Sequence, residues 1–137
     1  MDIGVFAFIQ DTEGKILLVR DAGREQKWTM PGGGLEFQEL IPAAIEREVK
    51  EEAGVDIIVG KLIGIFSQKK TPGIAILFDA KISQGTLIPD GIETSAAEFF
   101  SYEQILSMGE SMKPAQLGMI KQRSEWNGAE PIFNYFS

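Results

Sequence analysis

The chain has 137 residues, 44% of them hydrophobic, which is the size of one domain with a core of its own. It contains no cysteine and no histidine, which excludes disulfides, thiolate or imidazole metal ligands, cysteine nucleophiles and catalytic triads that use histidine. Thirteen basic against 20 acidic residues give a net charge of −7, so neither nucleic acid nor an acidic membrane is an expected partner.

The amino-terminal segment lacks a basic stretch, and no apolar run approaches the 18 residues of a membrane span. We therefore expect a cytoplasmic protein, with residues 1–137 forming a single domain. Any metal site must be built from oxygen ligands, which favours Mg²⁺ or Mn²⁺.

In chain order, the pattern predicts strands over residues 5–9, 16–19 and 28–30, a helix over about 41–53, strands over 55–66, 74–82 and 96–102, and helices over 103–108 and 114–124. We expect the first two strands to form a hairpin around the turn at residues 11–14. Gly54 supplies a stop signal for the first helix. This order predicts a mixed α/β sandwich instead of a regular βαβ repeat.

The last seven residues, 131–137, are rich in aromatic side chains. Two uses of this tail stay open at this point. It packs on the body of its own domain, or it forms the surface of a homodimer.

Glutamates gather within residues 36–52, and four of them fall in the first predicted helix, among them Glu48, Glu51 and Glu52. At 100° per residue, Glu51 lies at about −60° and Glu52 at about +40° from Glu48, so the three share one side of the helix. Carboxylates this close repel one another unless a cation lies among them. A divalent metal is one interpretation and a solvated acidic face is the other.

Three glycines, Gly32 to Gly34, precede this helix, and we expect them to form a loop. Backbone without a Cβ atom, beside a helix amino terminus, allows a phosphate or a metal to approach main-chain groups. The alternative is a plain strand-to-helix turn. Together, the glycines and the carboxylates favour metal-bridged phosphate chemistry.

The full spacing of these residues is Gly33-x5-Glu39-x7-Arg47-Glu48-Val49-x-Glu51-Glu52-x-Gly54-Val55. It resembles the Nudix box, GX5EX7REUXEEXGU with U aliphatic, at every fixed position. The resemblance implies the Nudix fold, an α/β/α sandwich around a mixed β-sheet. It also implies a Mg²⁺-dependent pyrophosphohydrolase, with Mn²⁺ as a substitute, that cleaves a small nucleoside diphosphate derivative.

The same resemblance implies roles for the residues of the box. Arg47 would orient the catalytic carboxylates, with Glu39 as its partner at the edge of the substrate site. The metal ligands would be Glu48, Glu51, Glu52 and the backbone carbonyl of Gly33.

The resemblance leaves more than one candidate for the general base. Members of the family often take a further glutamate from the loop before the last strand, and Glu93 occupies that place here. Glu52 is the other candidate for the base, and Glu98 is the runner-up to Glu93.

Candidate substrate contacts are Arg20, Trp28, Gly32 and Gly34, besides Glu39. The tryptophan ring can stack on a base and the arginine can contact a phosphate, although core packing and simple exposure also explain them. Pro72 and the loop around residues 92–94 resemble the group that hydrolyses ADP-ribose or sugar nucleotides. The alternatives are a MutT-like nucleoside triphosphate pyrophosphohydrolase and a non-catalytic nucleotide-binding sensor.

Two positions depart from the family pattern. Gln38 stands where glycine is common, and Leu40 stands where serine or threonine usually caps the helix. The missing cap is expected to cost about 1 kcal/mol of stability. The shape of the loop and the start of the helix are therefore open.

Overall fold

The computed structural model describes residues 2–23, 25–68 and 73–136, and it contains two sheets and three α-helices within them. The elements are β1 (Asp2–Ile9), β2 (Ile16–Asp21), β3 (Trp28–Thr29), β4 (Gly32–Gly34), α1 (Ile41–Ala53), β5 (Asp56–Gln68), β6 (Gly73–Gln84), β7 (Thr94–Phe100), α2 (Tyr102–Leu106), a 3-10 turn (Gly109–Ser111), α3 (Pro114–Ser124) and β8 (Ile132–Phe136).

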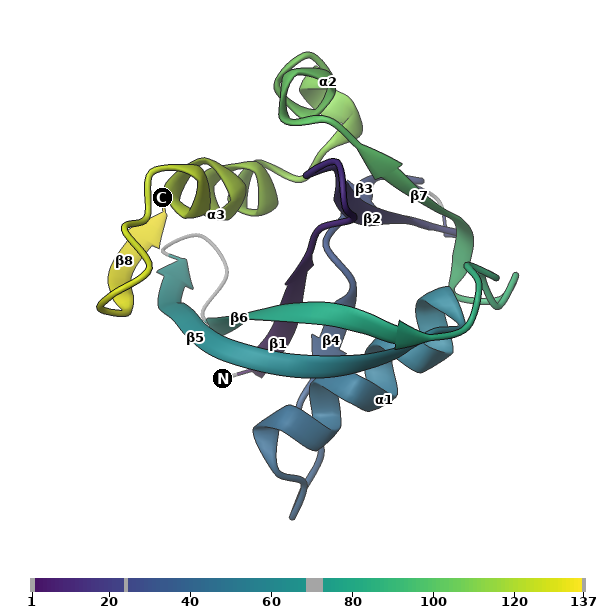
Figure 1. The fold of residues 1–137 in the computed structure, drawn as a ribbon, viewed down its shortest axis with the longest axis horizontal. Coiled ribbons are helices and arrows are strands. Elements are labelled where there is room, and N and C mark those ends of the chain that lie inside the picture. Colours follow the sequence, from purple (N-terminus) through teal and green to yellow (C-terminus); the bar gives the residue numbers. More distant parts are fainter. Residues whose placement is uncertain (1, 24, 69–72, 137) are drawn as a thin grey trace.

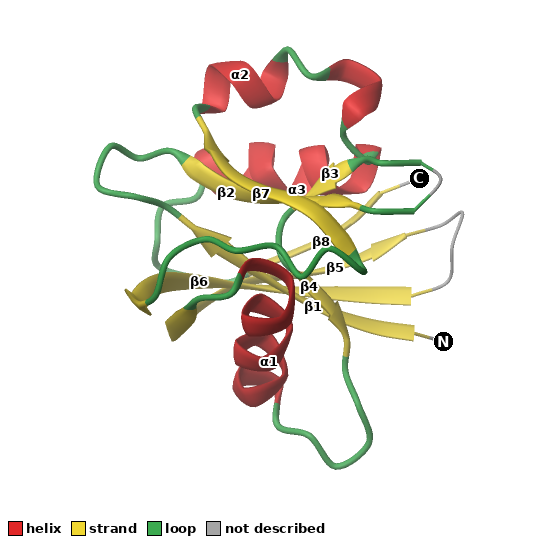
Figure 2. Ribbon diagram, turned by 90° about the vertical axis from the view of Figure 1, so that its right-hand side faces the viewer, coloured by secondary structure: helices red, strands yellow, loops and turns green. Residues whose placement is uncertain are grey.

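The larger sheet has the strand order β4-β1-β6-β5-β8. It is mixed, because β1 runs parallel to β6 and β5 parallel to β8, whereas the other neighbours are antiparallel. A smaller antiparallel sheet has the order β3-β2-β7. Figures 1 and 2 show the two sheets with α1 and α3 on different sides of the larger one.

Successive side chains of β1 face opposite sides of the larger sheet, and this explains how the sheet holds both α1 and α3. Val5 and Ala7 are buried in one core together with Ile45 and Val49 of α1. Phe8 points to the other face and is buried in a second core that includes residues of α3. Because successive strand residues face opposite sides, a single strand anchors both layers. The predicted α/β/α sandwich around a mixed sheet is confirmed.

The predicted hairpin is wrong. β1 and β2 belong to different sheets, and one isolated bridge between Gln10 and Ile16 joins them. The reason is that both edges of β1 already carry partners, β4 on one side and β6 on the other. The chain still turns at Asp11, whose carboxylate accepts the N–H of Glu13 and Lys15, but β2 then leaves to pair with β3 and β7.

The three glycines also differ from expectation, because they form strand β4 instead of a loop. β4 pairs antiparallel with β1, with Gly32 opposite Phe6 and Gly34 opposite Gly4. A Cβ atom added to Gly32 would lie 2.1 Å from the carbonyl oxygen of Val5. The glycine is therefore required by the close approach of two strands.

The helices α1 and α3 begin and end close to where the pattern placed them. The last long strand is shifted, since β7 begins at Thr94 and ends at Phe100, two residues before the predicted end. The chain then turns into α2 at a capping box, in which Ser101 accepts the N–H of Gln104 and the Gln104 side chain accepts the N–H of Ser101.

The aromatic tail forms β8, which pairs parallel with β5 at the edge of the larger sheet. The tail thus packs on its own domain, which was one of the two interpretations of the sequence. Phe133 nevertheless keeps 72% of its surface exposed. The homodimer stays a prediction. Among the described residues, no helix has the length and apolar character needed to cross a membrane.

The two departures from the family pattern shape the start of α1. Gln38 has a φ of 64°, the left-handed conformation that glycine adopts without strain. Leu40 is the N-cap residue, its backbone is extended, and no side chain caps the helix. The Leu40 side chain is 77% exposed, so it contributes little packing.

Replacing Leu40 by serine is expected to stabilise the protein by about 1 kcal/mol, because the hydroxyl can accept an orphan N–H of the first turn. Urea denaturation followed by circular dichroism measures the change. Leu40→Ala is the matched control, since it removes the same side chain without adding an acceptor. A serine variant no more stable than the alanine variant would contradict this account of the helix start.

Candidate active site

Arg47 lies at the centre of a network that joins α1 to the segment before it. Its Nε donates to Glu39 Oε2 at 2.7 Å, and its Nη2 donates to Glu39 Oε1 at 3.0 Å, a bidentate pair. Nη2 also donates to the carbonyl oxygen of Gly34 at 3.2 Å, and Nη1 donates to Glu48 Oε1 at 2.9 Å. One rigid guanidinium therefore orients a carboxylate of the preceding loop, the end of β4 and a carboxylate of α1.

These contacts shift the titration of the partners. The hydrogen bonds from Arg47 lower the pKa of the Glu39 carboxyl, so this group stays charged. The same contacts, above all that with Glu39, raise the pKa of the guanidinium further above its ordinary value. Both shifts favour the charged forms of the pair.

Glu48 is buried, with 8% of its surface exposed, and it lies against the glycine strand. A Cβ atom on Gly33 would lie 2.6 Å from the Glu48 carboxyl carbon, so this carboxylate occupies the space that the glycine leaves. Burial raises the pKa of Glu48, and the hydrogen bond from Arg47 offsets part of the rise. The backbone of Gly33 and the carboxylate of Glu48 thus lie directly against each other.

Glu52 lies one turn further along α1 and is also buried. Its Oε1 accepts the N–H of Gly32 at 2.7 Å, and its other oxygen takes no hydrogen bond from the described residues. Burial, helped by the nearby charges of Glu48 and Glu93, raises its pKa to about 8. This carboxylate therefore lacks the positive partner that a charged, buried group requires.

Glu51 completes the predicted trio and is the exposed member, with 49% of its side-chain surface accessible. Its Oε2 lies 3.5 Å from Nη1 of Arg47. In the described part of the chain, no three acidic side chains converge on one point as metal ligands do. The reason is local, since Arg47 draws Glu48 and Glu51 toward itself while Gly32 holds Glu52.

Even so, the residues fit a divalent cation. The three side chains offer oxygen atoms only, on one side of α1, and hard cations prefer such ligands. Two of the three are buried carboxylates whose pKa is raised by burial. Beside them, Gly33 provides backbone in a space that a Cβ atom would fill.

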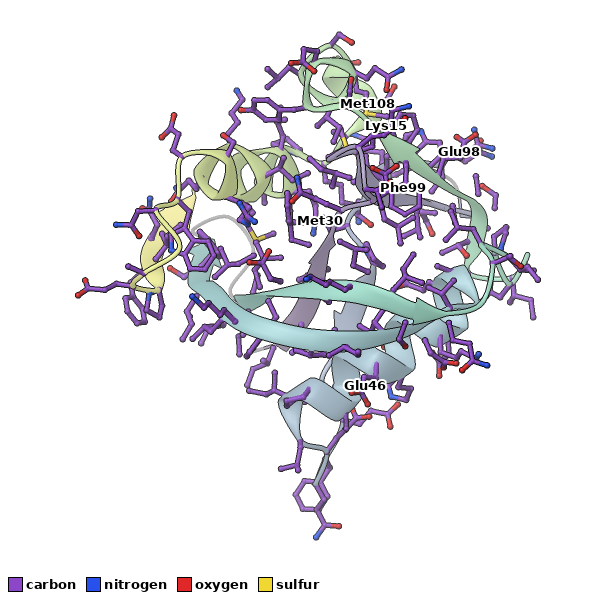
Figure 3. The ribbon with its side chains drawn as sticks, in the orientation of Figure 1. Lys15, Met30, Glu46, Glu98, Phe99 and Met108 are labelled. Carbon is purple, nitrogen blue, oxygen red and sulfur yellow. The ribbon has the colours of Figure 1, made fainter. Side chains whose placement is uncertain are left out.

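Glu93 reaches this cluster from the loop before β7. Its charge adds to the effect of burial, which raises the pKa of both Glu48 and Glu52. Its carbonyl oxygen accepts the N–H of Ala22, so the loop is also tied to the smaller sheet. Glu98, by contrast, is exposed along β7, and Figure 3 places it on the side of the molecule away from α1.

The other candidates lie elsewhere in the fold. The Arg20 Nε donates to Ser95 Oγ at 3.0 Å, and its guanidinium lies 5.8 Å from the centre of the Trp28 ring. Trp28 packs edge-on against Phe100 at 4.9 Å between ring centres. No contact among the described residues joins either one to the glutamates of α1. Their role as substrate contacts stays a prediction.

The sequence analysis missed two residues that hold Glu93 in place. Asp90 Oδ1 accepts the backbone N–H of Ile92, Glu93 and Thr94, each at 2.9 Å, and these bonds lower the Asp90 pKa. The buried Thr94 hydroxyl donates to the carbonyl oxygen of Glu52 at 2.8 Å. The available signal was an aspartate four residues before a threonine at the end of a loop.

Gln116 is a third residue that the sequence did not single out. It is buried on α3, and its Oε1 accepts the N–H of Met30 at 2.9 Å. This bond joins two residues that are 86 positions apart in sequence, and it holds the segment that leads into the glycine strand. A lone glutamine in a helix carries no sequence signal of such a role.

The matching family model is the NUDIX domain, over residues 2–122, so the chain belongs to the NUDIX family. Human diphosphoinositol polyphosphate phosphohydrolase 3-alpha is 42% identical over 65 residues, which are 47% of this chain and 40% of that protein. The chain thus spans less than half the length of this curated relative.

Two solved structures agree along most of the chain. A NUDIX hydrolase from Nitrosomonas europaea is 25% identical with a TM-score of 0.82, covering 99% of this chain and 78% of that one. The MutT protein from Methanosarcina mazei Go1 is 27% identical with a TM-score of 0.77, covering 93% of this chain and 95% of that one. The family and the fold expected from the box are confirmed.

Arg47→Lys is expected to lower kcat/KM for the hydrolysed substrate about 100-fold, because an ammonium group cannot bridge Glu39, Glu48 and Gly34 together. Steady-state kinetics at saturating Mg²⁺ measures the loss. Arg123→Lys is the matched control, since Arg123 is similarly buried and pairs with Asp79 at 3.1 Å, away from the site. Equal losses in both variants would contradict the positioning role of Arg47.

Glu52→Gln is expected to stabilise the protein in EDTA at pH 8. The native pKa of Glu52, about 8, lies above its ordinary value of 4.5. The native state therefore binds this proton more tightly, and its contribution to stability is complete below pH 4.5 and is lost as the pH rises through 8.

The neutral amide removes that loss, so the gain is expected to be about 2 kcal/mol at pH 8 and near zero at pH 4.5. Thermal unfolding of both proteins across this pH range measures it. Glu46→Gln, on the exposed side of α1, is the control. A gain that does not depend on pH would contradict the raised pKa.

Proposed function

We propose that this protein is a divalent-metal-dependent hydrolase that cleaves the pyrophosphate bond of a nucleoside diphosphate linked to another group. The observation that carries the proposal is the pair of buried carboxylates, Glu48 and Glu52, set against the glycine strand. Arg47 orients Glu48, and the N–H of Gly32 orients Glu52. A protein that bound nothing positive at this place would gain stability from neutral residues there. The acids are explained by a cation and the phosphates that it bridges.

In this proposal, Glu48, Glu51 and Glu52 hold Mg²⁺, for which Mn²⁺ substitutes, with the Gly33 carbonyl beside them. The bound cation supplies charge neutralisation at the phosphates and lowers the pKa of a water molecule. Arg47 keeps the carboxylates in their rotamers through its bond to Glu48 and its pair with Glu39.

We assign proton acceptance to Glu93. One oxygen of Glu52 accepts the N–H of Gly32 and the other would hold the cation, whereas the Glu93 side chain is exposed. The loop of Glu93 is fastened to α1 through Thr94 and to the smaller sheet through Ala22. A base on a fixed loop can remove the proton of an attacking water without leaving its place.

For the group linked to the nucleoside diphosphate we favour a sugar, as in ADP-ribose or a sugar nucleotide. The curated relative is named for a diphosphoinositol polyphosphate, but the match covers less than half of that protein. A net charge of −7 makes this chain a poor host for a ligand with many phosphates. Pro72, part of the sequence argument for ADP-ribose, lies outside the described residues.

A turnover screen tests the proposal directly. The panel holds ADP-ribose, sugar nucleotides, dinucleoside polyphosphates and nucleoside triphosphates, each with Mg²⁺, with Mn²⁺ and with EDTA, and products are identified by mass. Cleavage of a sugar-linked diphosphate that EDTA abolishes is the expected result. Cleavage of triphosphates alone would favour the MutT-like alternative, and nucleotide binding without cleavage would favour a sensor.

Two variants separate the roles of the carboxylates. Glu51→Gln is expected to lose Mg²⁺-dependent turnover together with metal affinity, and to keep its fold because the side chain is exposed. Glu93→Gln is expected to lower kcat at least about 100-fold while metal affinity is retained. Calorimetric titration with Mn²⁺ and steady-state kinetics measure both. Full turnover in either variant would refute its assigned role.

A further inference from the structure

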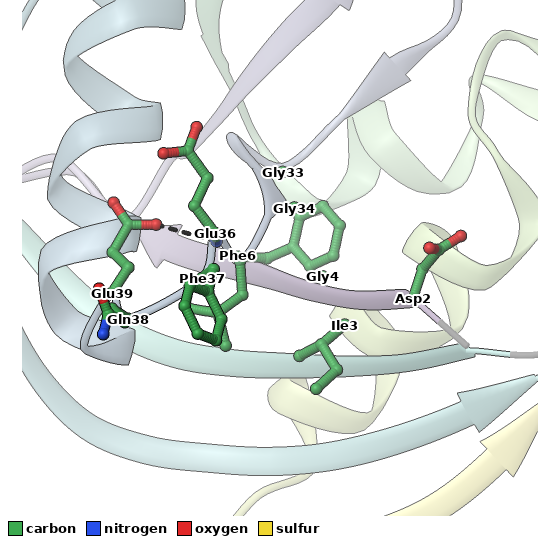
Figure 4. Close-up of a pocket in the computed structure, with 11 residues that line it drawn as sticks. Asp2, Ile3, Gly4, Phe6, Gly33, Gly34, Glu36, Phe37, Gln38 and Glu39 are labelled. Carbon is green, nitrogen blue, oxygen red and sulfur yellow. Dashed lines mark hydrogen bonds between the residues drawn. The ribbon is translucent and has the colours of Figure 1, made fainter.

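A pocket of about 720 Å³ adjoins the site on the side away from the carboxyl end of α1. Its wall consists of the first half of β1, the end of β4 and the segment that leads to α1 (Figure 4). Gly33, Gly34 and Glu39 belong both to this wall and to the network around Arg47 and Glu48. The pocket and the glutamates of α1 therefore share the end of the glycine strand as a common wall.

The floor of the pocket is an apolar platform. A Cβ atom added to Gly4 would lie 2.9 Å from one edge of the Phe6 ring, and one added to Gly32 would lie 2.5 Å from another part of it. The ring thus covers the two glycines on the face of β1 opposite α1. The half-buried Phe6 offers a flat surface on which the C–H face of a sugar can pack.

Gly34 marks the open part of the wall. A Cβ atom added to Gly33 or Gly32 would strike a neighbour, but one added to Gly34 would meet nothing within 4 Å. The glycine is thus not needed for the packing of the protein itself. A larger side chain at this one position would intrude into the pocket without striking the protein.

The titratable side chains that line the pocket are all acidic. Asp2, Glu36 and Glu39 line it, and among its described residues there is no lysine or arginine. Glu39 forms a bidentate pair with Arg47, and Glu36 lies 3.7 Å from the same guanidinium with 69% of its side chain exposed. Figure 4 draws Asp2 and Glu36 on either side of Phe6. Carboxylates accept hydrogen bonds from hydroxyl groups and repel phosphates.

We propose that this pocket holds the sugar of the substrate, with the Phe6 ring against its apolar face and Asp2 and Glu36 accepting hydrogen bonds from its hydroxyls. The inference rests on the proposed function, and it adds the specificity that the metal cluster does not provide. The same carboxylates reject a group that carries further phosphates. Asp2, Glu36 and the absence of a side chain at Gly34 determine the substrate class.

The first test compares ADP-ribose with ADP-ribose 1″-phosphate, which differ by one phosphate on the sugar. The wild-type protein is expected to prefer ADP-ribose about tenfold in kcat/KM. Asp2→Lys is expected to reduce that preference about fivefold. Glu46→Lys is the matched control, because it makes the same charge change at an exposed position of α1 outside the pocket, and it leaves the preference unchanged.

The second test fills the pocket. Gly34→Val is expected to raise KM for ADP-ribose about tenfold and to change kcat less than about twofold, with an unchanged thermal midpoint. Equal kcat/KM for ADP-ribose and ADP-ribose 1″-phosphate would overturn the pocket assignment. A KM for ADP-ribose that Gly34→Val does not change would also overturn it. Either result leaves the proposed function standing, provided that ADP-ribose is hydrolysed. Failure to cleave any pyrophosphate overturns both.

Discussion

The bond between Arg47 and its carboxylate partners is the constraint on which the site depends. A guanidinium is planar and holds two oxygens of one carboxylate in a fixed direction, as it does with Glu39. The remaining donors reach Glu48 and the Gly34 carbonyl. The loop before α1, the last residue of β4 and the Glu48 carboxylate of the helix are therefore held as one unit.

The glycine strand makes this arrangement sterically feasible. Gly32 permits β4 to approach β1, and its N–H supports Glu52. Gly33 leaves room for the carboxylate of Glu48. The result is two buried acids whose pKa values are raised by burial. Two buried carboxyl groups thereby lie beside bare backbone.

Much of this could be predicted from the sequence, because the signals were local. The spacing from Gly33 to Val55 identified the family, and helical periodicity placed Glu48 and Glu52 at the edge of the core. The hairpin was predicted wrongly because sheet membership depends on long-range pairing, and β6, far along the chain, takes the edge of β1 that β2 would have used. The hydrogen bonds of Thr94 with Glu52 and of Gln116 with Met30 join residues that are 42 and 86 positions apart. No local sequence pattern encodes such contacts.

The most direct measurement of the account is the affinity of the protein for Mn²⁺, determined by calorimetric titration of the wild type, Glu48→Gln and Glu46→Gln at one pH. The account predicts binding to the wild type and to Glu46→Gln with equal affinity, and affinity at least about tenfold weaker for Glu48→Gln. Equal affinity in all three proteins, or no binding to the wild type, would contradict the claim that the carboxylates beside the glycine strand form a metal site.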